Sequence, residues 1–149
     1  MSAFPPPASE PLATAVLGTE LAIAAMLVVG MFVVRAGHVR AHRAIQGSMV
    51  LLNIPIVLVL MLPYYWQYVL PGLPAAGGQP FYLYPTVMLV AGILAEALGV
   101  YILLVAGTNL IPERFRFRRY KRWMRTELIL WWAVVLAGIA TYYAWWFPT

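Results

Sequence analysis

Four long apolar stretches, separated by short polar segments, run along this chain of 149 residues. They cover about residues 12–34, 44–65, 84–108 and 127–146, and each is close to the roughly 20 apolar residues that a helix needs to cross a bilayer. The pattern predicts an all-α fold, a four-transmembrane-helix bundle over residues 12–149. The Pro-rich start, residues 1–11, predicts an extended N-terminal arm and no signal peptide, because it has no basic region.

The composition agrees with a membrane protein. The chain is 63% hydrophobic and 10% charged, whereas soluble domains carry about 25% charged residues. It has no cysteine, which excludes disulfides, thiolate metal sites and a cysteine nucleophile. The sequence contains no hydrolase triad, phosphate loop or dinucleotide motif, so we expect no enzymatic activity.

Positive charge is confined to two of the three segments between the apolar stretches. The first, residues 35–43, holds three arginines; the third, residues 109–127, is strongly basic; the second, residues 66–81, has no charge. Cytoplasmic loops are enriched in Lys and Arg. We therefore expect a bacterial inner-membrane protein with both termini outside. Aromatic clusters at residues 64–68, 82–84 and 142–146 fall at the predicted outer end, where interfacial aromatic belts occur.

The third segment alternates Arg with Phe in RFRFRRYKRW (residues 114–123). This predicts a basic patch for anionic lipids or an acidic partner surface. The alternative is an ordinary positive-inside anchor. Because the charges adjoin apolar spans, nucleic acid is not an expected partner. The residues of this basic patch are Arg114, Arg116, Arg118, Arg119, Lys121, Arg122 and Arg125.

Three polar side chains lie deep inside the predicted spans: Glu20, Asn53 and Glu96. With about 1.5 Å of rise per residue and alternating span directions, they fall at similar depth and predict an intramembrane polar layer. A hydrogen-bonded structural layer is the leading interpretation. A proton path, a contact to a quinone head group, or contacts to another membrane subunit are the alternatives. No Lys or Arg shares this depth, so either the carboxyl groups are neutral or a counter-charge comes from outside the chain.

The only two histidines, His38 and His42, stand four residues apart and would share one helix face. Such a pair is a candidate for haem, zinc or copper, although it needs further ligands. The neighbouring arginines disfavour a cation. We therefore interpret the histidines as part of the basic end of the second span, expect no cofactor, and keep haem or copper as the alternative.

The chain also resembles a known family. The motif RAHRAIQGSMV (residues 40–50), Leu94-Ala95 with Gly99, and RYKRWMRTELILWWAVVLAGIATYY (residues 119–143) are similar to those of small four-span bacterial membrane proteins of unknown function. That family includes cytochrome oxidase assembly membrane proteins. The resemblance covers residues 35–146 and implies three histidines that handle haem or copper. Only His42-Arg43 matches; the positions near Ala91 and Tyr120 have no histidine.

The absence of two of the three histidines implies that this chain keeps the four-span scaffold of the family but not its haem or copper ligands. We expect a non-catalytic accessory or assembly subunit of an electron-transfer complex, a respiratory oxidase or a photosynthetic reaction centre, with other integral membrane subunits and anionic lipids as partners. The alternatives are a haem- or copper-handling protein of oxidase maturation and a small proton-coupled transporter.

Overall fold

A computed structural model describes residues 10–147, and every regular element within that range is a helix. Most of the predicted N-terminal arm lies outside the described residues. Its last two residues, 10 and 11, belong to the first helix. The elements in chain order are α1 (Glu10–Arg35), α2 (Val39–Pro55), η1 (Ile56–Met61), α3 (Leu62–Tyr64), η2 (Tyr65–Val69), η3 (Leu70–Gly72), α4 (Leu73–Ala76), α5 (Pro80–Gly107), η4 (Glu113–Phe115) and α6 (Tyr120–Trp146).

Four helical segments are long and apolar enough to cross a membrane: Pro11–Arg35, Val39–Ala76, Pro80–Gly107 and Tyr120–Trp146. The prediction of an all-helical fold with four such helices is confirmed. Each predicted apolar stretch lies largely within a longer helix, because polar and aromatic residues continue the helix beyond its apolar part. The largest difference is in the uncharged segment 66–81, which we expected to be a loop and which is helical as far as Ala76.

Two wide, π-helical turns allow the second helix to continue past its prolines. η1 precedes Pro63, and η2 precedes Pro71. A proline has no N–H, and its ring collides with the carbonyl four residues back. Widened turns are a common response to such a disruption. In both cases the residue before the proline donates to a carbonyl five residues back: Leu62 N–H to Val57 O, and Leu70 N–H to Tyr65 O.

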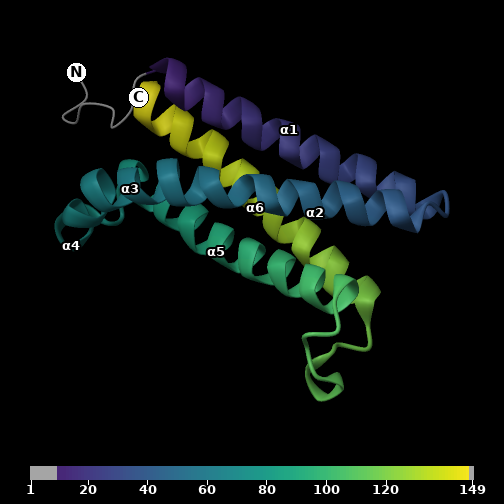
Figure 1. The fold of residues 1–149 in the computed structure, drawn as a ribbon. Helices are drawn as coiled ribbons and strands as arrows, with labels where there is room; N and C mark the ends of the chain where they lie inside the picture. The colour runs from purple at the N-terminus through teal and green to yellow at the C-terminus, as the bar shows by residue number, and fades with distance from the viewer. Residues whose placement is uncertain (1–9, 148–149) are drawn as a thin grey trace.

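The tight turn between α1 and α2 depends on Gly37. Its φ of +88° lies in the left-handed region, which glycine adopts without steric cost. Gly37 N–H donates to Val34 O and His38 N–H donates to Val33 O, the two hydrogen bonds of a Schellman motif. The motif ends α1 and reverses the chain within a few residues. As a result α1 and α2 form an antiparallel hairpin (Figure 1).

The four long helices form an antiparallel bundle (Figure 1). α5 packs along α6, α1 packs against both α2 and α6, and α2 meets α5 over a shorter stretch. The centre of the bundle is apolar and contains Ile23, Leu27, Ala95, Trp131 and Val134. α1 begins and α6 ends at one end of the bundle, while the α1–α2 turn and the loop between α5 and α6 lie at the other.

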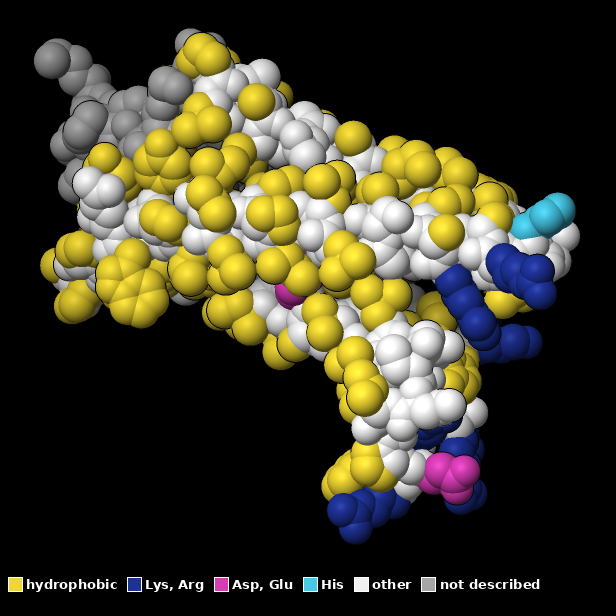
Figure 2. Space-filling view, in the orientation of Figure 1, with side chains coloured by type: hydrophobic (Ala, Val, Ile, Leu, Met, Phe, Trp, Pro, Cys, Tyr) yellow, Lys and Arg dark blue, Asp and Glu magenta, His cyan; other side chains and the backbone are white. Residues whose placement is uncertain are grey.

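The outer surface separates charge from apolar area along the same axis. Lys and Arg side chains gather at the end with the α1–α2 turn and the α5–α6 loop, and hydrophobic side chains are spread over much of the remaining visible face (Figure 2). Large hydrophobic residues such as Leu51, Val59, Ile129 and Leu136 are more than 60% exposed. A water-soluble monomer rarely exposes so continuous an apolar surface.

Candidate functional site

Three carboxyl groups and one carboxamide, one from each long helix, lie inside the bundle. Glu20 comes from α1, Asn53 from α2, Glu96 from α5 and Glu127 from α6. The exposed fraction is 4% for Glu20, 3% for Asn53 and 7% for Glu127, and Glu96 is half-buried. We call these four residues the carboxyl cluster. Glu96 lies close enough to both Glu20 and Glu127 for their carboxyl groups to interact electrostatically.

Asn53 and Glu96 are hydrogen-bonded across the α2–α5 contact. The Asn53 side-chain amide donates to Glu96 Oε2 over 2.9 Å. Asn53 lies two residues before Pro55, and its backbone carbonyl accepts from Ile56 N–H. The amide oxygen Asn53 Oδ1 and the second carboxyl oxygen Glu96 Oε1 are both buried without a hydrogen-bond partner. The pair therefore keeps unused acceptors inside the bundle, which costs free energy unless a donor reaches them.

Glu20 is the most isolated member of the cluster. Both of its carboxyl oxygens are buried, and neither has a hydrogen-bond partner. Apolar residues of the core, including Ile23 and Leu27, follow it on α1. Glu20 also lines two neighbouring cavities, a small one shared with Asn53 and Trp131 and a larger one in the half of the bundle away from the basic residues.

Glu127 is the residue that we missed in the sequence. Seven basic residues precede it, so we interpreted it as part of the charged segment. In the structure it is buried beside Gly99, where an added Cβ would lie 2.8 Å from Glu127 Oε1. Its spacing in the sequence could have indicated this burial. Glu127 precedes Trp131 and Val134 at intervals of four and three residues, so it shares a helical face with these and other buried residues of α6.

Glu127 lies nearer the basic end of the bundle than Glu96. Its carboxyl group lies against Gly99, which is three residues after Glu96 on α5 and therefore about 4.5 Å closer to that end. The polar groups thus extend from near the basic end to the middle of the bundle.

Glu20 and Glu96 lie far along their helices from any positive residue. All ten Lys and Arg residues of the chain lie in the stretches 35–43 and 114–125. The one nearest in sequence to Glu127, Arg125, is exposed. A charged carboxyl in an apolar interior is costly without a counter-charge. The cluster can therefore hold protons or bind a group that supplies positive charge.

The structure separates the two histidines. His38 precedes α2 and is exposed, whereas His42 is 8% exposed and faces α1. His42 Nδ1 lies 2.8 Å from Gly30 O and must donate, because a carbonyl only accepts. One turn further on, Gln46 Nε2 donates to Leu27 O over 3.3 Å. His42 thus fastens α2 to α1. Among residues 10–147, no group of three or more His, Asp or Glu side chains is arranged to hold a metal ion.

The basic patch is divided between a loop and a helix. Lys121, Arg122 and Arg125 are exposed on the first turns of α6, and Arg114, Arg118 and Arg119 are exposed in the loop that precedes it. Arg116 is different, because its guanidinium group is half-buried and bonds within the loop. It donates to Ile111 O (3.0 Å), Thr108 O (2.7 Å) and Asn109 Oδ1 (3.2 Å).

Comparisons with protein-family models, curated proteins and solved structures found no match for this chain. Membership of the four-span family that the sequence resembles stays a prediction.

Proposed function

We propose that this protein is a non-catalytic, multi-pass subunit of the bacterial inner membrane that packs against other membrane subunits of a larger complex. The contact surface would be the face formed by α2 and α5 around Glu96. Glu96 would provide the polar contact on this face, and the basic patch would bind anionic lipid head groups on the cytoplasmic side.

The observation that carries the proposal is the half-buried carboxyl group of Glu96 on an otherwise apolar face. Acidic side-chain atoms are visible within the hydrophobic surface over α2 and α5 (Figure 2). Around them the α2–η1 and α5 segments expose Leu51, Leu52, Leu58, Val90, Ile93 and Leu94. A carboxyl group facing lipid at mid-depth is costly. A polar or cationic side chain from a partner helix would lower that cost.

The type of complex is supported by the sequence resemblance alone, which favours an electron-transfer complex such as a respiratory oxidase or a photosynthetic reaction centre. The topology that we propose places the basic end in the cytoplasm and both termini outside. It is supported by the collection of Lys and Arg at one end of the bundle.

The test is affinity purification from native membranes in a mild detergent, followed by mass spectrometry and an absorption spectrum of the eluate. We expect stoichiometric co-purification of other membrane subunits. Glu96→Gln removes the charge but keeps an acceptor for Asn53, and should lower the yield of these subunits severalfold. Glu113→Gln is the matched control, because Glu113 is exposed in the α5–α6 loop.

Equal yields from the wild type and from Glu96→Gln would contradict docking through this face. A protein that purifies alone with a haem or copper absorption band would instead favour the cofactor-handling alternative, with His42 as the first residue to replace.

Proton-coupled transport is the second candidate function. The arrangement of Glu127, Glu96 and Glu20 favours it, because Glu96 lies close to both of the others and successive carboxyl groups can pass protons. Proton-driven uptake into vesicles that is lost in Glu96→Gln would support this alternative.

A further inference from the structure

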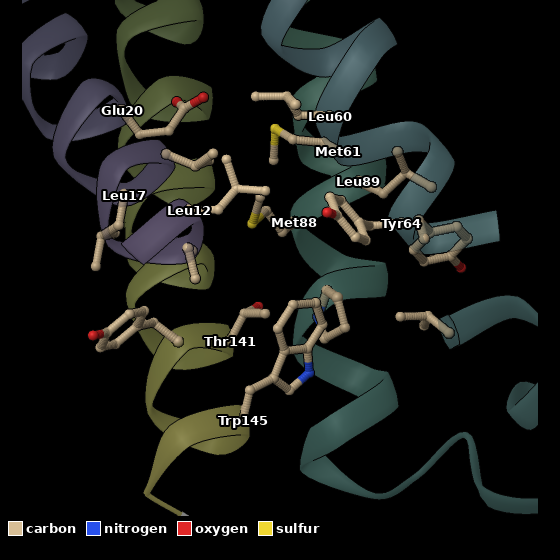
Figure 3. Close-up of a pocket in the computed structure, with 17 residues that line it drawn as sticks. Leu12, Leu17, Glu20, Leu60, Met61, Tyr64, Met88, Leu89, Thr141 and Trp145 are labelled. Atoms are coloured by element: carbon tan, nitrogen blue, oxygen red, sulfur yellow. The ribbon is translucent and has the colours of Figure 1, made fainter. Parts of the chain in front are cut away.

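A pocket opens between the helices in the half of the bundle away from the basic residues (Figure 3). Its walls come from α1, the second helix, α5 and α6, and include Leu17, Met61, Met88 and Trp145. Its cavity volume is about 120 Å³. An apolar cavity of ~150 Å³ holds a benzene molecule, so this pocket has room for a ligand with one aromatic ring.

Most polar groups in the pocket wall already have partners within the protein. Each of four such side chains makes a hydrogen bond, so none of them needs a ligand. The bonds join the Tyr65 hydroxyl to Thr86 Oγ1 (3.2 Å), the Tyr142 hydroxyl to Thr14 Oγ1 (3.1 Å), the Thr141 hydroxyl to Ala137 O (2.7 Å), and Trp145 Nε1 to Phe81 O (3.1 Å).

Glu20 has no such partner, and it lies at the inner end of the pocket. Figure 3 shows its carboxyl group pointing from α1 into the space beside Leu60 and Met61. Its side chain is 4% exposed, and neither oxygen has a hydrogen-bond partner. Of the described residues that line the pocket, Glu20 is the only one with an ionisable carboxyl group.

We propose that this pocket binds a lipophilic amine, with its ammonium group paired to Glu20 and its apolar body between α1, α5 and α6. An ammonium ion supplies both the hydrogen-bond donors and the positive charge that Glu20 lacks. The aromatic rings of Tyr64, Tyr65 and Trp145 in the wall suit a cation that enters through the mouth. The same ion pair forms whether the amine arrives charged or takes the proton of a neutral Glu20 carboxyl.

A lipid acyl chain is the competing occupant, because it would also fill the apolar part of the pocket. It offers no donor to Glu20, however, and would leave both carboxyl oxygens unsatisfied. The two occupants therefore differ in how their binding depends on the charge of residue 20. Amine binding does not depend on the subunit role, because Glu96 does not line the pocket.

The test is equilibrium dialysis of the full-length protein in lipid nanodiscs, with empty nanodiscs as the reference for partitioning. The probes are benzylamine and its neutral counterpart benzyl alcohol. We expect saturable binding of the amine and about tenfold or more weaker binding of the alcohol. Glu20→Gln should lower the affinity for the amine to that for the alcohol.

Two further variants keep the result interpretable. Glu127→Gln is the matched control, because it neutralises another buried carboxyl group that does not line the pocket. Its affinity for the amine should stay within about twofold of the wild-type value. Gly138→Leu fills the pocket, since Gly138 lines it and an added Cβ would meet only Met88 Sδ at 3.5 Å, and it should abolish binding of both probes.

Equal binding of amine and alcohol by the wild type would overturn the proposal, and this comparison requires no variant to fold. An unchanged amine affinity in Glu20→Gln would also overturn the proposal. A tightly held lipid that neither probe displaces would do the same.

Discussion

Gly99 and Glu127 lie against each other at the point where α2, α5 and α6 meet. A Cβ on Gly99 would lie 2.8 Å from Glu127 Oε1 and 2.9 Å from Val50 Cγ2, closer than real side chains approach. The missing side chain thus leaves the space that the carboxyl group of Glu127 occupies. Small residues at helix contacts commonly allow close packing in membrane proteins. Here the same feature holds a buried carboxyl group in place.

We expect Gly99→Ala to destabilise the bundle by ~2 kcal/mol, because overpacking a core usually costs 1–3 kcal/mol. The methyl group must displace either Val50, from α2, or Glu127. Thermal unfolding in detergent, followed by circular dichroism, measures the change. Gly18→Ala is the control, since a Cβ there meets nothing within 4 Å. An equal loss of stability in both variants would show that Gly99 has no special packing role.

The loop between α5 and α6 is held by its own side chains. Arg116 donates to three acceptors on residues 108–111, and the hydroxyl of Tyr101, on α5, donates to Phe115 O. Phe117 packs against Tyr101, Tyr120 and Trp123, with ring centroids 4.8–5.6 Å apart. The alternation of Arg and Phe therefore makes a folded connection, with part of its positive charge directed inwards.

We expect Arg116→Gln to loosen this loop, because it removes charge-assisted hydrogen bonds worth together at least ~1.4 kcal/mol. Chymotrypsin, which cleaves after Phe115 and Phe117, should then cut the loop about tenfold faster. Arg118→Gln should leave the rate unchanged, because Arg118 is exposed. If both variants are cut at the wild-type rate, the contacts of Arg116 do not limit opening of the loop.

At the scale of the whole molecule, charge and aromatic residues mark opposite ends of one antiparallel bundle. The α1–α2 turn and the α5–α6 loop carry the Lys and Arg residues, and the end where α4 meets α5 contains Tyr82, Phe81 and Trp145 in contact. Both features follow from the antiparallel order of the helices. They support one orientation in the membrane, with the basic end in the cytoplasm.

Single cysteines can test this orientation, because the chain has no native cysteine. We expect a membrane-impermeant maleimide to label Gln79→Cys, in the α4–α5 turn, in intact spheroplasts. His38→Cys and Arg118→Cys, at the basic end, should be labelled only after permeabilisation. All three positions are exposed, so access to each depends on which side of the membrane it lies. The reverse labelling pattern would invert the proposed topology.

Apolar length and loop charge were enough to predict four helices and two chemically distinct ends, because both are local properties of the chain. They could not predict that the second helix continues to Ala76, since this depends on widened turns before Pro63 and Pro71.

The depth of each residue, counted along the predicted spans, also placed Glu20, Asn53 and Glu96 near one another. It could not show that Asn53 bonds Glu96 while Glu20 faces a pocket, because helix rotation and packing decide which side chains meet. Glu127 joins the cluster for the same reason: the close approach of α5 and α6 at Gly99 buries a carboxyl group that stands only two residues from an exposed arginine.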